Sequence, residues 1–224
     1  MTETTNYNQE MLFDDSYKTI ATLSEGIFRD RGSKFIGLLF PIKNEIEFKK
    51  HYNELKKLHH KANHHCYAIR LTPDRSIFKS SDDREPAGTA GRPILNTLLS
   101  NDTTDCGLIV VRYFGGTLLG VPGLINAYKS AAEESVKNAT IILKEITEHY
   151  QLNFNYDLMN DVMNLLKNHS AKIYENTFEN ECIIKFEIAK SKADLLINEI
   201  TTNYLFKDKI KIRSNDNTGS TTHA

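Results

Sequence analysis

The hydrophobic pattern divides the chain into two stretches of different character. Residues 16–140 hold short apolar runs between turns, and all five prolines and ten of the eleven glycines lie there. From Tyr150 onward, alternation of apolar and polar residues and helical spacing take over. We therefore predict two domains, 16–140 and 145–213, preceded by a flexible arm at 1–15 and followed by a disordered tail at 214–224.

The first stretch predicts strands interleaved with helices. Apolar and β-branched runs predict strands at 17–27, 34–42, 65–71, 76–80 and 107–114. One helix is predicted at 45–60, where Asn44 and Glu47 form a capping box and the apolar side includes Phe48 and Leu58. A second is predicted at 89–99, capped by Thr89. A third begins near Pro122 and has a buried stripe of Leu124, Ile125, Tyr128, Ala132 and Val136. The strand at 107–114 is apolar on both faces, which predicts a central position in a sheet.

The second stretch predicts a smaller sheet with two helices. Strands are predicted at 150–156, 171–174, 182–189 and 210–212. Asp157 and Ser191 are the predicted helix caps, and the second helix extends to about Tyr204. The resulting order, β-α-β-β-α-β, is that of the ferredoxin-like fold, so the chain is assigned to the α+β class. The spacing shows no Cys, His, Asp and Glu constellation here, which favours a binding or packing module.

Composition narrows the class of protein. A net charge of −1 gives no global basic field for nucleic acid. Three cysteines, an odd number and far apart, favour reduced thiols. No apolar run approaches the length of a membrane span, and residues 1–10 lack the apolar core of a signal peptide. We expect a cytoplasmic protein that does not bind membranes.

Candidate chemistry is concentrated in residues 82–128, beside the predicted central strand. Glycine-rich loops commonly carry function, because glycine permits positive φ and close backbone approach. Three carboxylates stand within four residues: Asp82, Asp83 and Glu85. Crowded carboxylates can recruit Mg²⁺ or act as acid and base. We favour the alternative, in which Arg84 and Arg92 neutralise the turn and the aspartates cap backbone N–H groups.

A second glycine loop precedes the third predicted helix and contains Gly115, Gly116 and Gly120. A helix N-terminus behind glycines presents free N–H groups to an anion, and Arg112 adds donors for phosphate. The loop lacks the Lys-Ser/Thr of a Walker motif, and Pro122 removes one N–H from the helix start.

Five of the eight histidines cluster at 51–65, next to Cys66. Zinc binding needs converging ligands or further cysteines, so we favour a structural or solvent-facing role for this cluster. A Cys66 nucleophile assisted by a histidine and Asp83 stays open as an alternative. The sequence therefore predicts no metal and no cofactor.

Four motifs occur in order along the first stretch. They are RGSKF at 31–35, HHCYA at 64–68, the segment 82–91 with RPIL at 92–95, and RYFGG at 112–116. In this arrangement the chain closely resembles the Impact family, in its bacterial YigZ-type form. The resemblance implies an N-terminal domain with the ribosomal-protein-S5-domain-2-like fold. It also implies a C-terminal domain similar to the last domain of elongation factor G.

The resemblance also implies a role in translation, and this chain differs from the usual family sequence at four positions. Eukaryotic members act in translational control by binding a partner of the kinase that senses uncharged tRNA. The family usually has glycine, lysine, glycine and arginine at four positions where this chain has Arg84, Leu118, Pro122 and Asn126. The differences at Leu118 and Asn126 remove two cations beside the glycine loop, and each lost phosphate contact weakens electrostatic binding.

Our leading hypothesis is a cytoplasmic, non-catalytic, translation-associated binding protein. Its expected partner is the ribosome, RNA or a translation-control protein, and no reading of DNA sequence is expected. The predicted contact residues are His64, His65, Arg92, Arg112, Tyr113, Gly115, Gly116 and Gly120, with the exposed face of the C-terminal sheet as a second surface. The alternatives are a hydrolase of phosphorylated small molecules, using Asp82, Asp83, Glu85 and Arg112, and a pure protein-interaction module.

Overall fold

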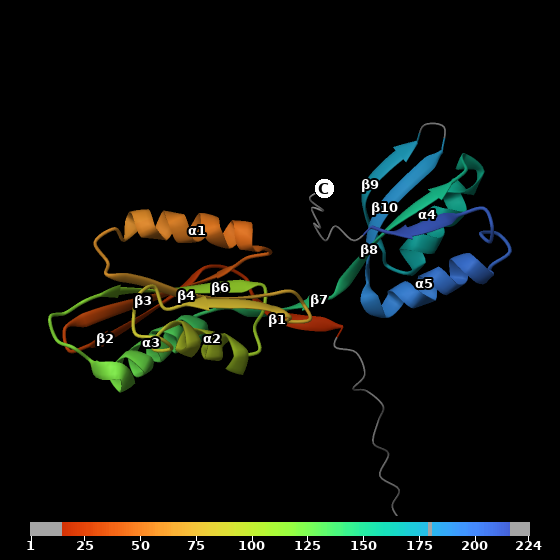
Figure 1. Ribbon diagram of the computed structural model, residues 1–224. Helices are drawn as coiled ribbons and strands as arrows, with labels where there is room; N and C mark the ends of the chain where they lie inside the picture. The colour runs from red at the N-terminus through yellow and green to blue at the C-terminus, as the bar shows by residue number, and fades with distance from the viewer. Residues whose placement is uncertain (1–14, 179–180, 216–224) are drawn as a thin grey trace, which may run out of the picture. The chain divides into compact units, whose positions relative to one another are not determined.

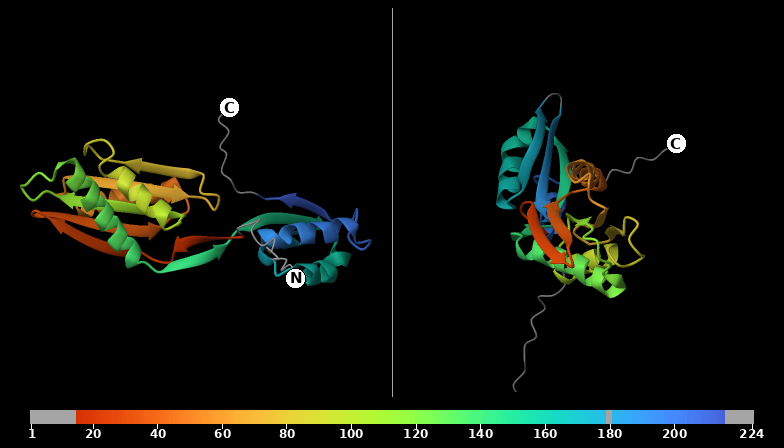
Figure 2. Two further views of the ribbon diagram at one scale, coloured as in Figure 1. Left: turned by 90° about the horizontal axis from the view of Figure 1, so that it is seen from below. Right: turned by 90° about the vertical axis from the view of Figure 1, so that its left-hand side faces the viewer.

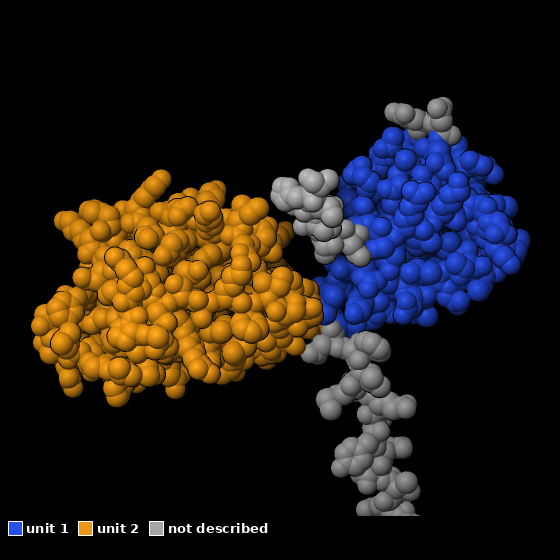
Figure 3. Space-filling view, viewed as in Figure 1, with its two compact units in different colours: residues 1–15, 145–224 blue, residues 16–144 orange. Residues whose placement is uncertain are grey.

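The computed structural model describes residues 15–178 and 181–215. The predicted arm and tail therefore lie almost wholly outside the described residues. The chain separates into two compact units, with the division between Lys144 and Glu145 (Figure 3). We call residues 16–144 the N-terminal unit, and Asp15 together with the described residues from 145 onward the C-terminal unit.

The N-terminal unit alternates strands and helices. Its elements are β1 (Ser16–Ile20), β2 (Ser24–Asp30), β3 (Ser33–Pro41), α1 (Glu45–Leu58), β4 (His64–Leu71), β5 (Ile77–Ser81), α2 (Gly91–Ser100), β6 (Cys106–Tyr113), α3 (Gly120–Lys137) and β7 (Ile141–Glu145). Five strands form one sheet in the order β2-β3-β6-β4-β5, and β1 pairs with β7 in a separate two-stranded sheet. Helix α1 covers one face of the large sheet, and α2 and α3 cover the other (Figures 1 and 2).

Strand β6 occupies the middle of the sheet, which confirms the predicted central strand. Successive side chains of a strand point to opposite faces, so β6 contributes to two separate cores. Leu108 and Val110 pack with Tyr128 under α2 and α3, whereas Ile109 and Val111 pack under α1. Because of this alternation, polar side chains of the sheet can contact one another only when they lie on the same face.

Two predictions for the first strands and helices were wrong. The single strand at 17–27 is two strands, because the chain turns at 21–23 and the N–H of Ala21 donates to the carbonyl of Thr140 at 2.9 Å. Leu58 and Ile125, expected on buried helix faces, are 71% and 39% exposed. Leu58 is the last residue of α1, and Ile125 lies next to the buried Leu124 on α3.

The capping of α1 confirms a local prediction. Asn44 Oδ1 accepts a hydrogen bond from the N–H of Glu47 at 2.9 Å. Glu47 reaches back one residue further than expected, to the N–H of Lys43 at 2.8 Å. Thr89, by contrast, does not cap α2, since its hydroxyl donates to the carbonyl of Pro86.

The C-terminal unit is a four-stranded antiparallel sheet with two helices. Its elements are β8 (Thr147–Phe154), η1 (Tyr156–Leu158), α4 (Met159–Asn168), β9 (Lys172–Phe178), β10 (Cys182–Ala189), α5 (Lys190–Thr202) and β11 (Lys211–Ser214). The strand order β11-β8-β10-β9 confirms the predicted ferredoxin-like unit. Its core includes Leu152, Ile184 and Phe186, and neither α4 nor α5 has the predicted side-chain cap.

None of the helices in the described ranges combines the length and the apolar character needed to cross a lipid bilayer.

Candidate functional site

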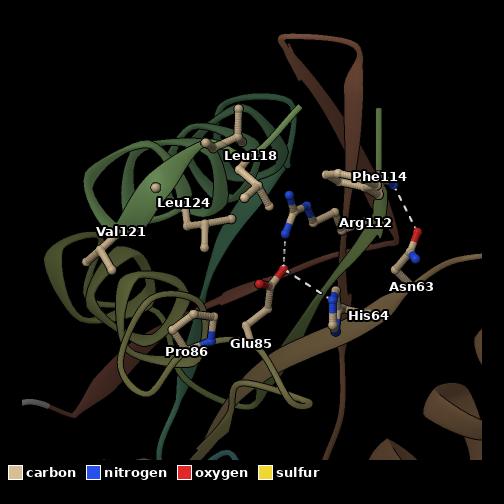
Figure 4. Close-up of a pocket in the computed structure, with 11 residues that line it drawn as sticks. Asn63, His64, Glu85, Pro86, Arg112, Phe114, Leu118, Val121 and Leu124 are labelled. Carbon is tan, nitrogen blue, oxygen red and sulfur yellow. Dashed lines mark hydrogen bonds and ion pairs between the residues drawn. The ribbon is translucent and has the colours of Figure 1, made fainter. Parts of the chain in front are cut away.

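The two glycine-rich loops of the N-terminal unit meet at one pocket of about 380 Å³ (Figure 4). The first loop contributes Glu85 and Pro86, and the second contributes Leu118 and Gly120. Strand β4 adds His64, and strand β6 adds Arg112. The remaining lining residues are Asn63, Phe114, Leu119, Val121 and Leu124. Figure 4 shows polar side chains on the strands and apolar side chains at the start of α3.

A buried network of three residues includes the ion pair at the floor of the pocket, which Glu85 and Arg112 line. Arg112 Nη1 donates to Glu85 Oε1 at 2.5 Å, and the Tyr128 hydroxyl donates to the same oxygen at 2.7 Å. Glu85 and Arg112 are only 8% and 5% exposed, and Tyr128 is fully buried. The alternation of β6 places Arg112 on the α3 face, where the buried stripe of α3 presents Tyr128. A buried carboxylate requires such partners, because desolvation of an unpaired charge is expensive.

Two aromatic rings hold the guanidinium of Arg112. Its central carbon lies 5.4 Å from the ring centroid of Phe35 and 5.6 Å from that of Phe114. Phe35 in turn makes an edge contact with the Tyr128 ring, at 5.1 Å between centroids. Cation–π attraction fixes the plane of the guanidinium in addition to the ion pair. Its Nε is buried without a hydrogen-bond partner in the described residues.

His64 is the cross-strand neighbour of Arg112 and faces the same pocket. Its Nδ1 lies 2.8 Å from the backbone carbonyl of Asp83. A carbonyl only accepts, so Nδ1 carries the proton and the neutral ring has its lone pair on Nε2. This Nε2 lies 3.7 Å from Glu85 Oε1. His64 therefore presents an acceptor to the pocket when neutral and an ion-pair partner to Glu85 when protonated.

The three carboxylates of the acidic turn separate in space. Asp82 accepts hydrogen bonds from the N–H groups of Gly88, Ala90 and Gly91 at 2.8–3.0 Å, and so caps α2 from outside the helix. Burial raises the pKa of the Asp82 carboxyl, but the three backbone donors together outweigh burial, so the net shift of this pKa is downward. Asp82 is therefore a structural cap.

Asp83 binds strand β4, whereas Asp82 binds the start of α2. Its Oδ2 accepts from the backbone N–H of His65 at 2.7 Å. Asp83 and Arg84 both have positive φ, +39° and +71°, the region that favours glycine. Arg84 is exposed and its Nε lies 3.9 Å from Asp83 Oδ1. Within the described ranges, no three Cys, His, Asp or Glu side chains converge as a metal site would need.

Cys66, on β4, lies in a closed environment. Its thiol donates to the backbone carbonyl of Asp82 at 3.1 Å, and its side chain is fully buried. Burial raises the pKa of the Cys66 thiol, so the reactive thiolate is disfavoured. This environment does not support the alternative of a Cys66 nucleophile.

The sheet separates two predicted contact residues from the others. His65 and Tyr113 lie on the α1 face, opposite His64 and Arg112, because they follow these residues directly on β4 and β6. Tyr113 packs there with His59, whose Nδ1 lies 2.9 Å from the Tyr113 hydroxyl. Burial lowers the pKa of both His59 and His65. Arg92 lies exposed on α2 and does not line the pocket.

The glycines of the second loop have different physical roles. A Cβ on Gly115 would lie 1.9 Å from the carbonyl carbon of Gly32, so Gly115 permits two turns to pack together. Gly116 and Gly120 have φ of +87° and +71°. Of the three predicted glycines, Gly120 lines the pocket, at the start of α3.

Sequence reasoning missed the aromatic and apolar members of the site. Tyr128 was predicted only as a core residue, and Phe35, Phe114 and Val121 were not singled out as site residues. The available signal was spacing: Tyr128 lies two helical turns beyond Val121, so both share one side of α3.

Comparison with known proteins identifies the class. A family model of the Impact N-terminal domain matches residues 31–136. The chain is 32% identical over 152 residues to the IMPACT family member YvyE of Bacillus subtilis, covering 68% of this chain and 70% of that protein. It is 31% identical over 162 residues to YigZ of Escherichia coli, covering 71% and 79%.

Structural comparison agrees. The crystal structure of a hypothetical protein superimposes with a TM-score of 0.70 at 25% identity, covering 89% of this chain and 97% of that one. This chain belongs to the IMPACT family.

Proposed function

We propose that this chain is a cytoplasmic, translation-associated binding protein, whose partner is the ribosome, RNA or a translation-control protein. The observation that carries the proposal is the internal pairing of the charges at the pocket. Glu85, Arg112 and Tyr128 satisfy one another, and Asp82 and Asp83 hold backbone N–H groups. Side chains engaged in this way shape a surface, and family membership supports its use in translation.

The rim of the pocket has the character of a contact surface. Phe114, Leu118 and Val121 are 45%, 82% and 52% exposed around the opening. Exposed apolar side chains grouped around a pocket are typical of binding sites. Arg92 on α2 and the outward face of the C-terminal sheet would provide further contacts.

The geometry gives the hydrolase alternative no support. A general base or nucleophile has to be free to reach a substrate. Asp82 is occupied by three backbone donors, and Glu85 Oε1 by Arg112 and Tyr128.

Co-sedimentation with ribosomes tests the proposal. The full chain should sediment with ribosomes or be retained with them in pull-downs at low salt, and Leu118→Glu, which places an anion in the apolar rim, should weaken the association at least several-fold. Leu58→Glu is the matched control, since Leu58 is 71% exposed on α1 and does not line the pocket. Nuclease treatment separates RNA from protein partners. Absence of ribosome, RNA and protein association at low salt would overturn the proposal.

A further inference from the structure

The ion pair at the floor of the pocket leaves two polar atoms unused. Arg112 Nη1 and Glu85 Oε1 bind each other, and within the described residues neither Arg112 Nη2 nor Glu85 Oε2 makes a hydrogen bond. Neither atom is sealed from solvent, in contrast to Arg112 Nε. The ion pair therefore offers the pocket one donor and one acceptor, beside the acceptor Nε2 of neutral His64 (Figure 4).

The charge at the floor sums to zero. With His64 neutral, Arg112 is the single cation among the described residues that line the pocket, and Glu85 neutralises it at 2.5 Å. A phosphate or carboxylate would meet the Glu85 carboxylate, and an ammonium group would meet the Arg112 guanidinium. Like charges placed close together disfavour binding. The site thus selects a neutral group that both donates and accepts a hydrogen bond, which is the chemistry of an amide.

The walls decide between a peptide amide and a nucleobase. Leu118, Val121, Leu124 and Pro86 form aliphatic walls, and one face of the Phe114 ring is occupied by Arg112. Bases bind by stacking on open aromatic faces, with cations for the flanking phosphates. Among the described lining residues, Phe114 has one ring face taken by Arg112, and the cation Arg112 is itself paired with Glu85, so free cations for flanking phosphates are not offered. An aliphatic side chain fits these walls, and about 380 Å³ lies at the low end of the roughly 300–1,000 Å³ of ligand pockets.

We propose that this pocket binds a neutral peptide segment of a protein partner. One aliphatic side chain packs against Leu118, Val121 and Leu124, and the N–H and C=O of one extended backbone residue meet Glu85 Oε2 and Arg112 Nη2. An extended residue presents its N–H and C=O on the same side of the chain, so both groups can reach the two free atoms of the ion pair. The proposal rests on the binding role proposed above and names the chemistry of its partner.

Three small probes with one side chain test the charge rule. N-acetyl-leucinamide is neutral, N-acetyl-leucine carries a carboxylate, and leucinamide carries an ammonium group. Titration of the ¹⁵N-labelled full chain by NMR should show saturable shifts at Gly120, Leu118 and the Arg112 side chain. N-acetyl-leucinamide should bind with Kd on the order of millimolar. Both charged probes should bind at least several-fold more weakly, and uridine should bind more weakly than the neutral probe.

A rim variant provides a test that does not depend on the buried network. Leu118→Lys adds a cation at an 82% exposed position of the apolar rim. It should therefore weaken the binding of N-acetyl-leucinamide and strengthen the binding of N-acetyl-leucine. Leu58→Lys should leave all affinities unchanged. Tighter binding of a charged probe or of uridine, or absence of pocket shifts at tens of millimolar N-acetyl-leucinamide, would overturn the proposal. The titration uses no ribosome or RNA, so its failure is distinct from failure of the proposed function.

Discussion

The two units bury different kinds of side chain. In the described part of the chain, every buried polar or charged side chain belongs to the N-terminal unit, including Arg70, Glu85 and Arg112. The buried core of the C-terminal unit is apolar, with Cys182 among its members. Apolar packing requires volume and shape, whereas a buried charge requires one particular partner. The N-terminal unit is therefore built around a specific site, and the C-terminal unit around apolar packing.

The two sheets also differ in whether their charged side chains are enclosed or exposed. Helices cover both faces of the large sheet in the N-terminal unit, so its charged side chains are enclosed. The C-terminal sheet carries Lys185 and Glu187 on its outward face, where Lys185 pairs with Glu175 at 2.7 Å. Exposed ion pairs of this kind stabilise little. Charged side chains are therefore paired with particular buried partners in the N-terminal unit, whereas in the C-terminal unit they keep the outer face of the sheet solvated.

The largest expected effect is the loss of Arg112. Arg112→Ala leaves Glu85 buried without its cation, and we expect the N-terminal unit to lose about 3–5 kcal/mol of unfolding free energy. Urea unfolding followed by hydrogen exchange, resolved for each unit, measures it. Replacing the whole network with Arg112→Met, Glu85→Leu and Tyr128→Phe should recover most of the loss. A cost for Arg112→Ala below about 1 kcal/mol would contradict a network that the fold depends on.

A matched pair of apolar substitutions, one in each unit, should have similar costs. Ile94→Val in the N-terminal unit and Ile184→Val in the C-terminal unit each remove one methylene from a fully buried side chain. Each should cost about 0.5–1.5 kcal/mol of unfolding free energy, because transfer and cavity terms are similar. The same hydrogen-exchange measurement applies. The two losses of unfolding free energy could instead differ by more than the loss caused by Arg112→Ala. In that case apolar packing, and not polar pairing, distinguishes the units.

The smallest expected effect is a pH dependence confined to the N-terminal unit. Burial lowers the pKa of His65 below its ordinary value of 6.5. Below that value the unfolded chain binds a proton that the folded chain does not, so unfolding free energy falls as pH falls. Above 6.5 the contribution of neutral His65 is fully present. Urea midpoints of wild type and His65→Phe, compared above 6.5 and about one unit below it, should show a flatter slope for the variant. Equal slopes would show that His65 does not contribute.

Local patterns in the sequence were sufficient for the elements and the family. Strand alternation and helical spacing act over a few residues, so the central strand, the cap at Asn44 and the β-α-β-β-α-β order were predictable. The boundary between β1 and β2 was not, because the turn depends on a contact with Thr140, far along the chain.

The candidate site was only partly predictable. The sequence determined that the carboxylates, arginines and glycines of residues 82–128 are unusual, and period-two alternation already separates His64 from His65 on a strand. Only the tertiary structure decided that Glu85 pairs with Arg112 and Tyr128, while Asp82 caps α2 and Asp83 holds β4. The physical reason is that such pairs join residues far apart in the sequence. Which partner satisfies a buried charge is fixed by strand order and helix packing, and no local pattern records either.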